Sequence, residues 1–451
     1  MAANPADVPT SHDPDKTPVI PLHKARRWIE PWYVSYGILG ALASGLAVIL
    51  IPVLVVNSGG SATEIGGAIA AQNVGALMSP FWGWLADRTR AHRSIFSGGF
   101  VLLALGFLGF GTLQGSAAWL VFAFLIGFGT AASNTVASLF VVEFTPSEEW
   151  GARISWLQTF NAVGSVVGMA LAGWFSGPIG ALISSALVVP ALLLGRVGLP
   201  IPGSRFHRPQ PHLRYKNLAA LVRRIEPMTA SVVMRIHHPS LHDLAQIGSA
   251  FETNFGIFLV SWFFFSLSVS SFSSLYPVLM KHSYGMAVSS SASLMSAATL
   301  ASIPLYNFSG RFTTRRGPVP ALLIGIGTRA VVLVGLGVVA LVHPGSAILL
   351  AAVFFALFQG IWPLLSVAAN DLAAALAPFS QGTAVGLFNA SAAIASAAGA
   401  VLGGAIATYL GYAVVSLLAA VGLVIAFFFT LSLARHKPAA PPHPVSPTSR
   451  L

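Results

Sequence analysis

Residues 83–93 read Gly-Trp-Leu-Ala-Asp-Arg-Thr-Arg-Ala-His-Arg, and a partial copy of this stretch, Gly-Arg-Phe-Thr-Thr-Arg-Arg-Gly, occupies residues 310–317. The first glycines of the two stretches are 227 positions apart. A second match has almost the same offset, because Phe160-Asn161-Ala162 recurs 228 positions later as Phe388-Asn389-Ala390. Two independent matches at nearly one offset indicate that the chain consists of a duplicated unit.

The composition places this duplicated unit in a membrane. Of the 451 residues, 55% are hydrophobic and only 8% are Asp, Glu, Lys or Arg, whereas soluble domains carry about 25% charged residues. So few charges cannot cover a water-facing surface, which excludes a soluble enzyme. The chain also has no cysteine, which excludes disulfides, thiolate metal sites and a thiol nucleophile.

Twelve apolar runs follow one another along the chain, each long enough for a helix that crosses the bilayer, which needs about 20 residues. The runs are too long for strands and lack strict alternation. They fall at residues 33–56, 64–86, 95–114, 117–141, 154–176, 180–199, 253–280, 285–308, 318–342, 346–370, 382–408 and 411–434. The sequence therefore predicts an all-α integral membrane protein with twelve transmembrane helices in two pseudo-symmetric six-helix bundles, at residues 31–199 and 252–434.

Polar segments surround the two predicted bundles. Residues 1–30 form a tail, residues 200–251 form a linker whose apolar spacing predicts an amphipathic helix, and the Pro- and Ser-rich residues 435–451 predict a disordered tail. The segments predicted to be cytoplasmic hold 22 of the 24 Lys and Arg residues, when Arg196, near the end of the predicted span 180–199, is counted with the linker. This asymmetry predicts cytoplasmic termini and an inner-membrane location. It also explains the net charge of +11 without nucleic acid.

The chain resembles transporters of the major facilitator superfamily across residues 30–435. The family has a loop signature, Gly-x-x-x-Asp-Arg-x-Gly-x-Arg-Arg, between its second and third helices. The first copy matches it at Gly83, Asp87, Arg88 and Arg93, with Arg90 in place of the second glycine and His92 in place of a basic residue. The second copy keeps Gly310, Arg315 and Gly317 but has Thr314 in place of the acid.

The resemblance implies alternating access, in which the two bundles rock about a site near the bilayer midplane. It also implies that the loop signature latches the cytoplasmic side. We expect Asp87 to lie at the start of the eleventh helix, near Gly382, where the helix dipole favours an anion. Arg88 would pair with Glu143, and in the second copy Arg315 would pair with Asp371.

Uncharged polar side chains inside the spans are the candidates for a substrate cavity. Lipid exposure of an amide is unfavourable, so these groups should face the bundle interior. Whether they contact substrate or only other helices stays open at this point. The candidates are Gln72, Asn134, Gln158, Asn161, Trp262, Gln359, Trp362 and Asn389. Such a cavity is neutral and amphipathic, which favours an uncharged, weakly polar or aromatic compound.

Arg329 is the clear exception to the rule that charges avoid the spans, because it lies about halfway along residues 318–342. Charged groups at this depth are expensive and therefore informative. One interpretation is a residue that binds an anion or couples transport to an ion. The other is a structural role, because the ninth helix is peripheral in the family fold.

These observations predict a secondary transporter that exports small organic compounds, with coupling to protons expected from the family. A glycine pattern across residues 164–178 weakly favours export, although close helix packing also explains it. Import or exchange of sugars or organic acids is the alternative. A non-transporting assembly or sensor protein is a rival from another class. We expect no catalytic residues, metal or cofactor, and partners limited to a small-molecule substrate, lipid and protons, with a functional monomer.

A membrane-embedded enzyme is the remaining rival. It would need acids, histidines or metal ligands clustered at the membrane surface. His237, His238 and His242 are the only candidate group, and a linker is their simpler interpretation. The chain also lacks a Gly-x4-Gly-Lys loop, which argues against ATP-driven transport.

Overall fold

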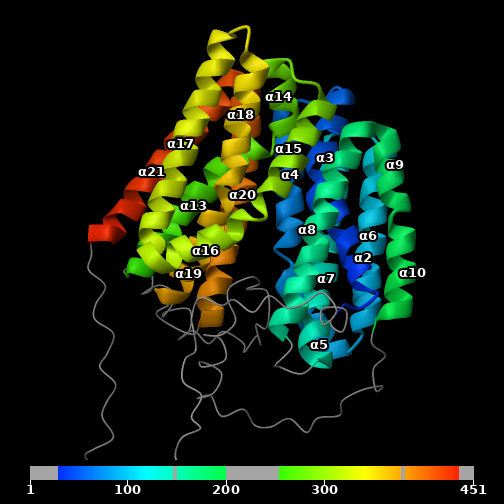
Figure 1. Ribbon diagram of the computed structural model, residues 1–451. Helices are drawn as coiled ribbons and strands as arrows, with labels where there is room; N and C mark the ends of the chain where they lie inside the picture. The colour runs from blue at the N-terminus through cyan, green and yellow to red at the C-terminus, as the bar shows by residue number, and fades with distance from the viewer. Residues whose placement is uncertain (1–28, 146–149, 200–252, 377–380, 436–451) are drawn as a thin grey trace, which may run out of the picture.

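The computed structural model describes residues 29–145, 150–199, 253–376 and 381–435 (Figure 1). Every regular element within these residues is a helix, which confirms the predicted all-α class. The terminal tails and the predicted amphipathic helix of the central linker lie outside the described residues.

The N-terminal half of the fold contains the helices before residue 199. A short π-helical turn, η1, connects α2 to α3, so that these three elements form one continuous span, Tyr33–Asn57. In chain order the elements are α2 Tyr33–Gly40, η1 Ala41–Leu46, α3 Ala47–Asn57, α4 Ala62–Ala76, α5 Ser79–Thr89, α6 His92–Thr112, α7 Ser116–Phe144, α8 Trp150–Trp174, α9 Pro178–Ala186 and α10 Val188–Gly198.

The C-terminal half has a similar order of helices, but its helices are interrupted at different positions. Its elements are α13 Asn254–Ser273, α14 Tyr276–Tyr284, α15 Val288–Ser302, α16 Leu305–Arg316, α17 Pro318–Val342, α18 Ala347–Gly360, α19 Trp362–Ala375, α20 Gln381–Leu410 and α21 Tyr412–Arg435. The signature stretches fall in α5 and α16 and the turns after them. We call this end of the molecule the loop-motif end, and the opposite end, where the turns before α4 and α18 lie, the sealed end.

The structure does not reach the predicted count of twelve spans. Among the described residues, ten helices are long and apolar enough to cross a membrane, or eleven if the pair α15 and α16, bent by 50°, counts as one span. The predicted span 64–86 is instead divided into α4 and α5, neither of which is long enough alone. Its polar Gln72 and Asn73 and the break at Leu77 and Met78 account for the difference.

Proline causes several of these breaks. It has no amide hydrogen to donate within a helix, so it is tolerated in a first turn but ends the helix before it. Pro80, Pro277 and Pro363 occupy first-turn positions of α5, α14 and α19, and Pro304 directly precedes α16. The predicted second, seventh, eighth and tenth spans are therefore each built from two helices.

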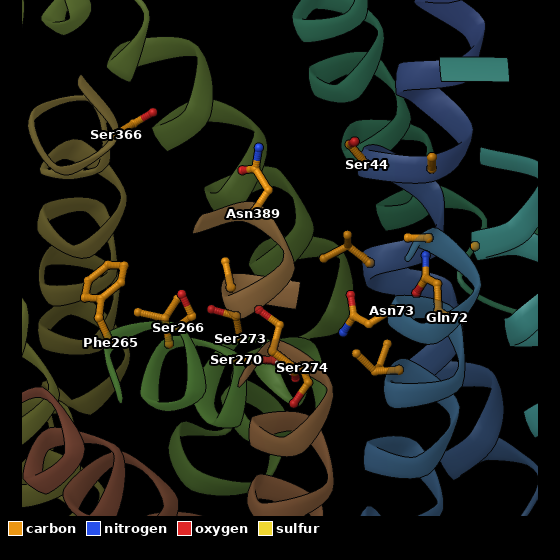
Figure 2. Close-up of a pocket in the computed structure, with 18 of the residues that line it drawn as sticks. Ser44, Gln72, Asn73, Phe265, Ser266, Ser270, Ser273, Ser274, Ser366 and Asn389 are labelled. Carbon is orange, nitrogen blue, oxygen red and sulfur yellow. Dashed lines mark hydrogen bonds between the residues drawn. The ribbon is translucent and has the colours of Figure 1, made fainter. Parts of the chain in front are cut away.

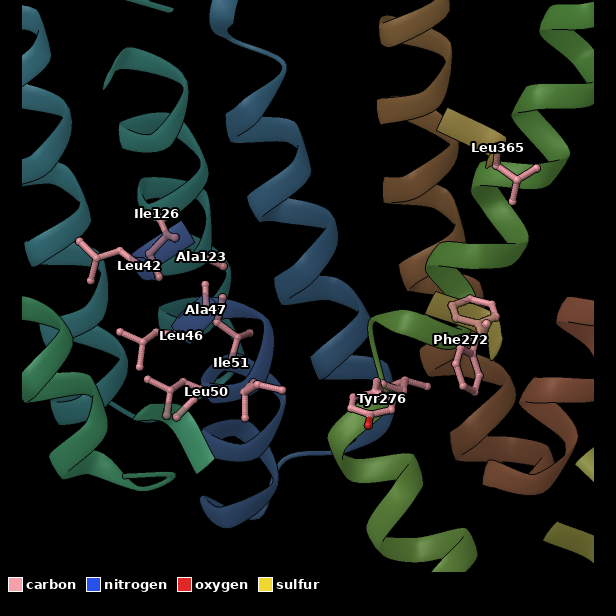
Figure 3. Packing of buried hydrophobic residues seen from close by; sticks show 14 of the residues in the cluster. Leu42, Leu46, Ala47, Leu50, Ile51, Ala123, Ile126, Phe272, Tyr276 and Leu365 are labelled. Atoms are coloured by element: carbon pink, nitrogen blue, oxygen red, sulfur yellow. The ribbon is translucent and has the colours of Figure 1, made fainter. Parts of the chain in front are cut away.

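Each half packs around its own central helices. In the N-terminal half, Leu42, Leu46 and Leu50 of the first span belong to a buried cluster that also contains Ala123 and Ile126 of α7 (Figure 3). In the other half, a separate group contains Phe272, Tyr276 and Leu365 (Figure 3). Glycines allow close contact within each half, with Gly164 and Gly168 of α8 against α2 and η1, and Gly399 and Gly403 of α20 against α13.

Large apolar side chains on the outer faces of the helices are exposed rather than buried. Val331 of α17 is 70% exposed, Leu349 of α18 67% and Phe428 of α21 62%. Exposure of this kind is typical of a surface that contacts lipid.

Candidate substrate cavity

A cavity of about 610 Å³ lies between the two halves. The N-terminal half contributes η1, α3, α4 and α7 to its wall, and the C-terminal half contributes α13, α19 and α20. The described lining contains no charged side chain. Four of the predicted cavity residues line it, namely Gln72, Trp262, Trp362 and Asn389. The volume suits a drug-sized ligand, because ligand pockets measure about 300–1,000 Å³.

The C-terminal wall carries a row of serines that sequence analysis missed. Ser266, Ser270, Ser273 and Ser274 of α13 and the turn after it all line the cavity (Figure 2). Their spacing of four, seven and eight residues is the spacing of one helical face, so the signal was present in the sequence. Further polar residues of the lining are Ser44, Asn73, Thr130, Ser366, Asn370 and Ser396.

An aromatic cluster forms part of the same wall. Trp262 and Phe265, one helical turn apart on α13, stack with ring centroids 4.5 Å apart, and Phe388 of α20 lies 5.2 Å from Trp262. Phe264 turns the other way and stacks on Phe429 of α21. The cavity therefore offers a flat apolar surface beside the row of hydroxyls.

A second pocket of about 270 Å³ adjoins the first in the N-terminal half, since Ala43, Ser44 and Thr130 line both. It contains Asn134, Gln158 and Asn161, three more of the predicted residues. The Tyr36 hydroxyl connects two of them, because it donates to Asn134 Oδ1 at 2.5 Å and accepts from Gln158 Nε2 at 3.4 Å. Tyr36 was not predicted.

The two halves contact each other toward the sealed end. The Thr63 and Thr408 hydroxyls are 2.9 Å apart, and Ser296 Oγ donates to the carbonyl of Val166 at 2.9 Å. Between described residues, no hydrogen bond joins the halves at the loop-motif end, and the halves diverge toward that end (Figure 1). The cavity extends in that direction as far as Asn370.

The family model described as Major Facilitator Superfamily matches residues 33–389 and 258–450. The chain belongs to the major facilitator superfamily. A search of curated protein sequences found no match. Among solved structures, nucleoside transporter NupG is similar at a TM-score of 0.68 and 12% identity, covering 90% of this chain and 99% of that one.

A bacterial homologue of the human lysosomal transporter Spinster, in an inward-facing and occupied conformation, is similar at a TM-score of 0.66 and 13% identity. The match covers 92% of this chain and 99% of that one. At such low identity, both similarities concern the superfamily's fold alone, which is that of an integral membrane transporter.

The superfamily signature in the first copy lies on α5 and at the start of α6. Arg88 is exposed, with its guanidinium 5.4 Å from the ring centre of Trp84. Arg93 Nη2 donates to the carbonyl of Arg196 at 2.8 Å, in the last turn of α10, where the helix dipole favours a cation. The side chains of Asp87 and Glu143 lie outside what the structure describes, so their pairings stay predictions.

The two copies of the signature end their helices with a positive φ at equivalent positions. Gly317 follows α16 with φ 84° and ψ 161°, a conformation that is essentially restricted to glycine. Arg90 follows α5 in the left-handed region, with φ 51°. The signature glycines differ in their surroundings: a β-carbon on Gly83 would contact Thr135, whereas one on Gly310 would meet open space.

The predicted ion pair between Arg315 and Asp371 does not form among the described residues. Their helices, α16 and α19, do pack against each other. Both side chains are exposed at the end where the halves diverge, and an exposed pair gains little from association.

Two predicted residues lie beside the cavity rather than in its wall. Gln359 Nε2 donates to Thr299 Oγ1 of α15 at 3.4 Å. Arg329 is 1% exposed, and its guanidinium carbon lies 4.0 Å from the ring centre of Phe358. The rings of Trp362 and Phe265, which line the cavity, are 5.3 and 5.6 Å from the same atom.

No group of three or more His, Asp or Glu side chains that could hold a metal occurs in the described part of the chain. The histidines at 237, 238 and 242 lie outside it. The described lining of the cavity offers hydroxyls, amides and aromatic rings.

Proposed function

We propose that this chain is a secondary active transporter that works by alternating access and exports small organic compounds across the cytoplasmic membrane. The observation that carries the proposal is a cavity between two repeat-related halves that contact each other toward one end and diverge toward the other. In alternating access, such a cavity exchanges substrate with one side of the membrane and, after the sealed side opens, with the other.

The direction of loading follows from the distribution of basic residues. The loop-motif end carries the signature arginines, and the positive-inside rule assigns that end to the cytoplasm. The closed contacts between α4 and α20 and between α8 and α15 would then face outward, and the state described is open to the cytoplasm. Loading from the cytoplasm is the first step of export, which we propose proceeds in a monomer with protons as the coupling ion.

A latch formed by the superfamily signature would stabilise the opposite state, in which the loop-motif end is closed. We propose that Gly83, Asp87, Arg88, Glu143, Arg315 and Asp371 act there when the halves converge. The latch must hold this state by only a few kcal/mol, or the cycle stalls. Arg88 and Arg315 are exposed, as expected if the latch is open in this state.

The test is transport in a bacterial host that lacks its major efflux pumps. Wild type and Asp87→Asn are expressed at matched membrane levels, with Thr89→Ala in the same helix as control, and accumulation of labelled compounds is measured with and without a protonophore. We expect wild type and Thr89→Ala to lower accumulation of at least one compound, Asp87→Asn to fail, and the protonophore to erase the difference.

Import of a neutral polar solute is the second candidate, favoured by the uncharged amide and hydroxyl lining. The same experiment separates the two. Higher accumulation in wild type would reverse the direction, and normal turnover by Asp87→Asn would remove the latch from the mechanism. No difference for any compound would contradict transport itself.

A further inference from the structure

Arg329 is a buried cation without a counter-ion. Its Nε and Nη1 atoms are buried and have no hydrogen-bond partner among the described residues, and no described carboxylate pairs with it. Burial of a guanidinium in a membrane span is expensive unless a charge or acceptor compensates for it. Buried donors are normally satisfied, so these two unpaired nitrogens require an explanation.

Aromatic rings surround the guanidinium but do not satisfy it. Phe358 of α18, Trp362 of α19 and Phe265 of α13 lie within 4.0, 5.3 and 5.6 Å of its central carbon. Ring faces attract a cation, yet they offer no lone pair to an N–H group aimed elsewhere. The rings therefore hold the guanidinium in place and leave donors free.

The free donors lie directly behind the wall of the cavity. Phe265 and Trp362 each contact the cavity on one side and the guanidinium on the other. Phe265 is buried, whereas Trp362 is 36% exposed and begins α19 immediately after the helix break. Trp362 therefore separates the cavity from Arg329.

We propose that Arg329 is the recognition site for a monovalent anion and that the cargo of this cavity is an organic monocarboxylate with an apolar or aromatic body. The inference rests on the proposed transport function and adds its substrate class. The carboxylate would accept from the guanidinium, the body would stack on Trp262 and Phe388, and the serines of α13 would bond its remaining polar atoms.

A single negative charge fits better than two. The described lining has no lysine, arginine or histidine, so a second charge would stay unpaired in a low-dielectric site. Inorganic chloride carries the same single charge, and the experiment below separates it from an organic carboxylate. The described lining of the cavity is neutral, and Arg329 behind it would supply the one positive charge that pairs with a singly charged compound.

The test uses the purified full-length chain in lipid nanodiscs. Benzoate, indole-3-acetate and octanoate, the corresponding neutral amides, and chloride in phosphate buffer are titrated while the unfolding midpoint and tryptophan fluorescence are recorded. We expect at least one carboxylate to raise the midpoint and to quench fluorescence, with binding about tenfold or more tighter than its amide, since an amide cannot pair with the cation.

Arg329→Met is the decisive variant, because it keeps the apolar volume and removes the charge. It should bind the carboxylate at least about tenfold more weakly without a lower midpoint in the absence of ligand, since an apolar isostere of a buried ion is often tolerated. Arg329→Lys should restore part of the affinity. A response to chloride alone, lost in Arg329→Met, would keep the anion site and assign it to an inorganic ion.

Three results would overturn the proposal: equal binding of acids and amides, unchanged binding by Arg329→Met, or no response of wild type to any anion. The comparison of wild type with Arg329→Met does not depend on whether Arg329→Lys folds. The comparison of acids with amides and the response to anions need only the wild-type protein. Transport of neutral compounds by Arg329→Met at the wild-type rate would leave the proposed function standing without the anion site. Anion binding without transport of any compound would leave the anion site standing and contradict the proposed transport function.

Discussion

The two halves meet along two seams that the internal repeat relates to each other, α4 on α20 and α15 on α8. The first seam is a contact of backbones. A β-carbon on Gly66 would lie 2.2 Å from the carbonyl oxygen of Ala400, and one on Gly404 would lie 2.4 Å from that of Ala62. In the second seam, a β-carbon on Gly173 would be 3.0 Å from the Ala292 side chain.

The closer approach at the first seam indicates that this seam determines how far apart the two halves lie. A carbonyl oxygen of a helix cannot move without the helix, so the α4–α20 seam admits no larger residue. At the second seam a β-carbon on Gly173 would meet its nearest neighbours at 3.0 Å (Ala292) and 3.2 Å (the carbonyl oxygen of Ser289), so the helices need to separate by only a few tenths of an ångström. We therefore expect the first seam to determine whether the sealed end closes and the second to tolerate change.

A covalent bond across the first seam should have the largest effect. The Thr63 and Thr408 hydroxyls are 2.9 Å apart, so cysteine sulfurs at the two positions can reach disulfide distance, and the chain has no other cysteine. We expect the oxidised Thr63→Cys/Thr408→Cys double variant to lose transport to background in vesicles, because the sealed end could no longer open. Reductant should restore it.

The single variants Thr63→Cys and Thr408→Cys are the controls and should transport with or without oxidant. Full transport by the cross-linked double variant, verified as cross-linked by mass spectrometry, would rule out opening at this end. Alternating access through the described cavity would then be wrong.

A methyl group on the first seam should have the next largest effect. Gly404→Ala forces the helices apart, at a cost of about 1–3 kcal/mol to the sealed state, which corresponds to a shift of roughly 5- to 150-fold in the equilibrium between the two states. Gly173→Ala, on the second seam, is the matched control. Spin labels on cysteines replacing the exposed Leu113 and His343 at the sealed end report the separation.

We expect a longer or broader distance between the labels in Gly404→Ala and an unchanged distance in Gly173→Ala. Transport should fall by about tenfold in the first variant and by less than about twofold in the second. Equal effects of the two variants would remove the distinction between the seams.

Much of this architecture could be predicted from the sequence, because a duplicated signature and long apolar runs are local features. The offset between Gly83 and Gly310 reflects one repeated unit, and the family match confirms the superfamily. The count of twelve spans is not confirmed, because proline and amides divide some of the apolar runs into shorter helices, as at Pro80. Apolar length alone does not show whether two short helices or one long helix will form.

The candidate cavity was only partly predictable. Amides such as Gln72 and Asn389 stood out because lipid excludes them, but serines are common and small, so the face containing Ser266 and Ser270 was overlooked. The surroundings of Arg329 could not be predicted at all, since Phe265, Phe358 and Trp362 meet there from three different helices. Tertiary contacts of this kind leave no local pattern.

Loss of the hydrogen bond between Ser296 and Val166 in the second seam should have the smallest effect. Ser296 Oγ donates to the Val166 carbonyl at 2.9 Å, and Ser296→Ala removes this bond without adding volume. The Val166 carbonyl lies within α8 and keeps its hydrogen bond within that helix, so the substitution leaves no unpaired acceptor. Interhelical hydrogen bonds of this type contribute on average about 0.6 kcal/mol in membranes.

We therefore expect Ser296→Ala to lower transport by less than about threefold and the free energy of unfolding by about 0.6 kcal/mol, measured by unfolding of the nanodisc-embedded chain. A far larger loss would mean that the second seam depends on this bond rather than on tolerant packing. Combined with Gly173→Ala, the effects should add, because neither change forces a backbone to move. Strong coupling between the two would show instead that this seam is as rigid as the first.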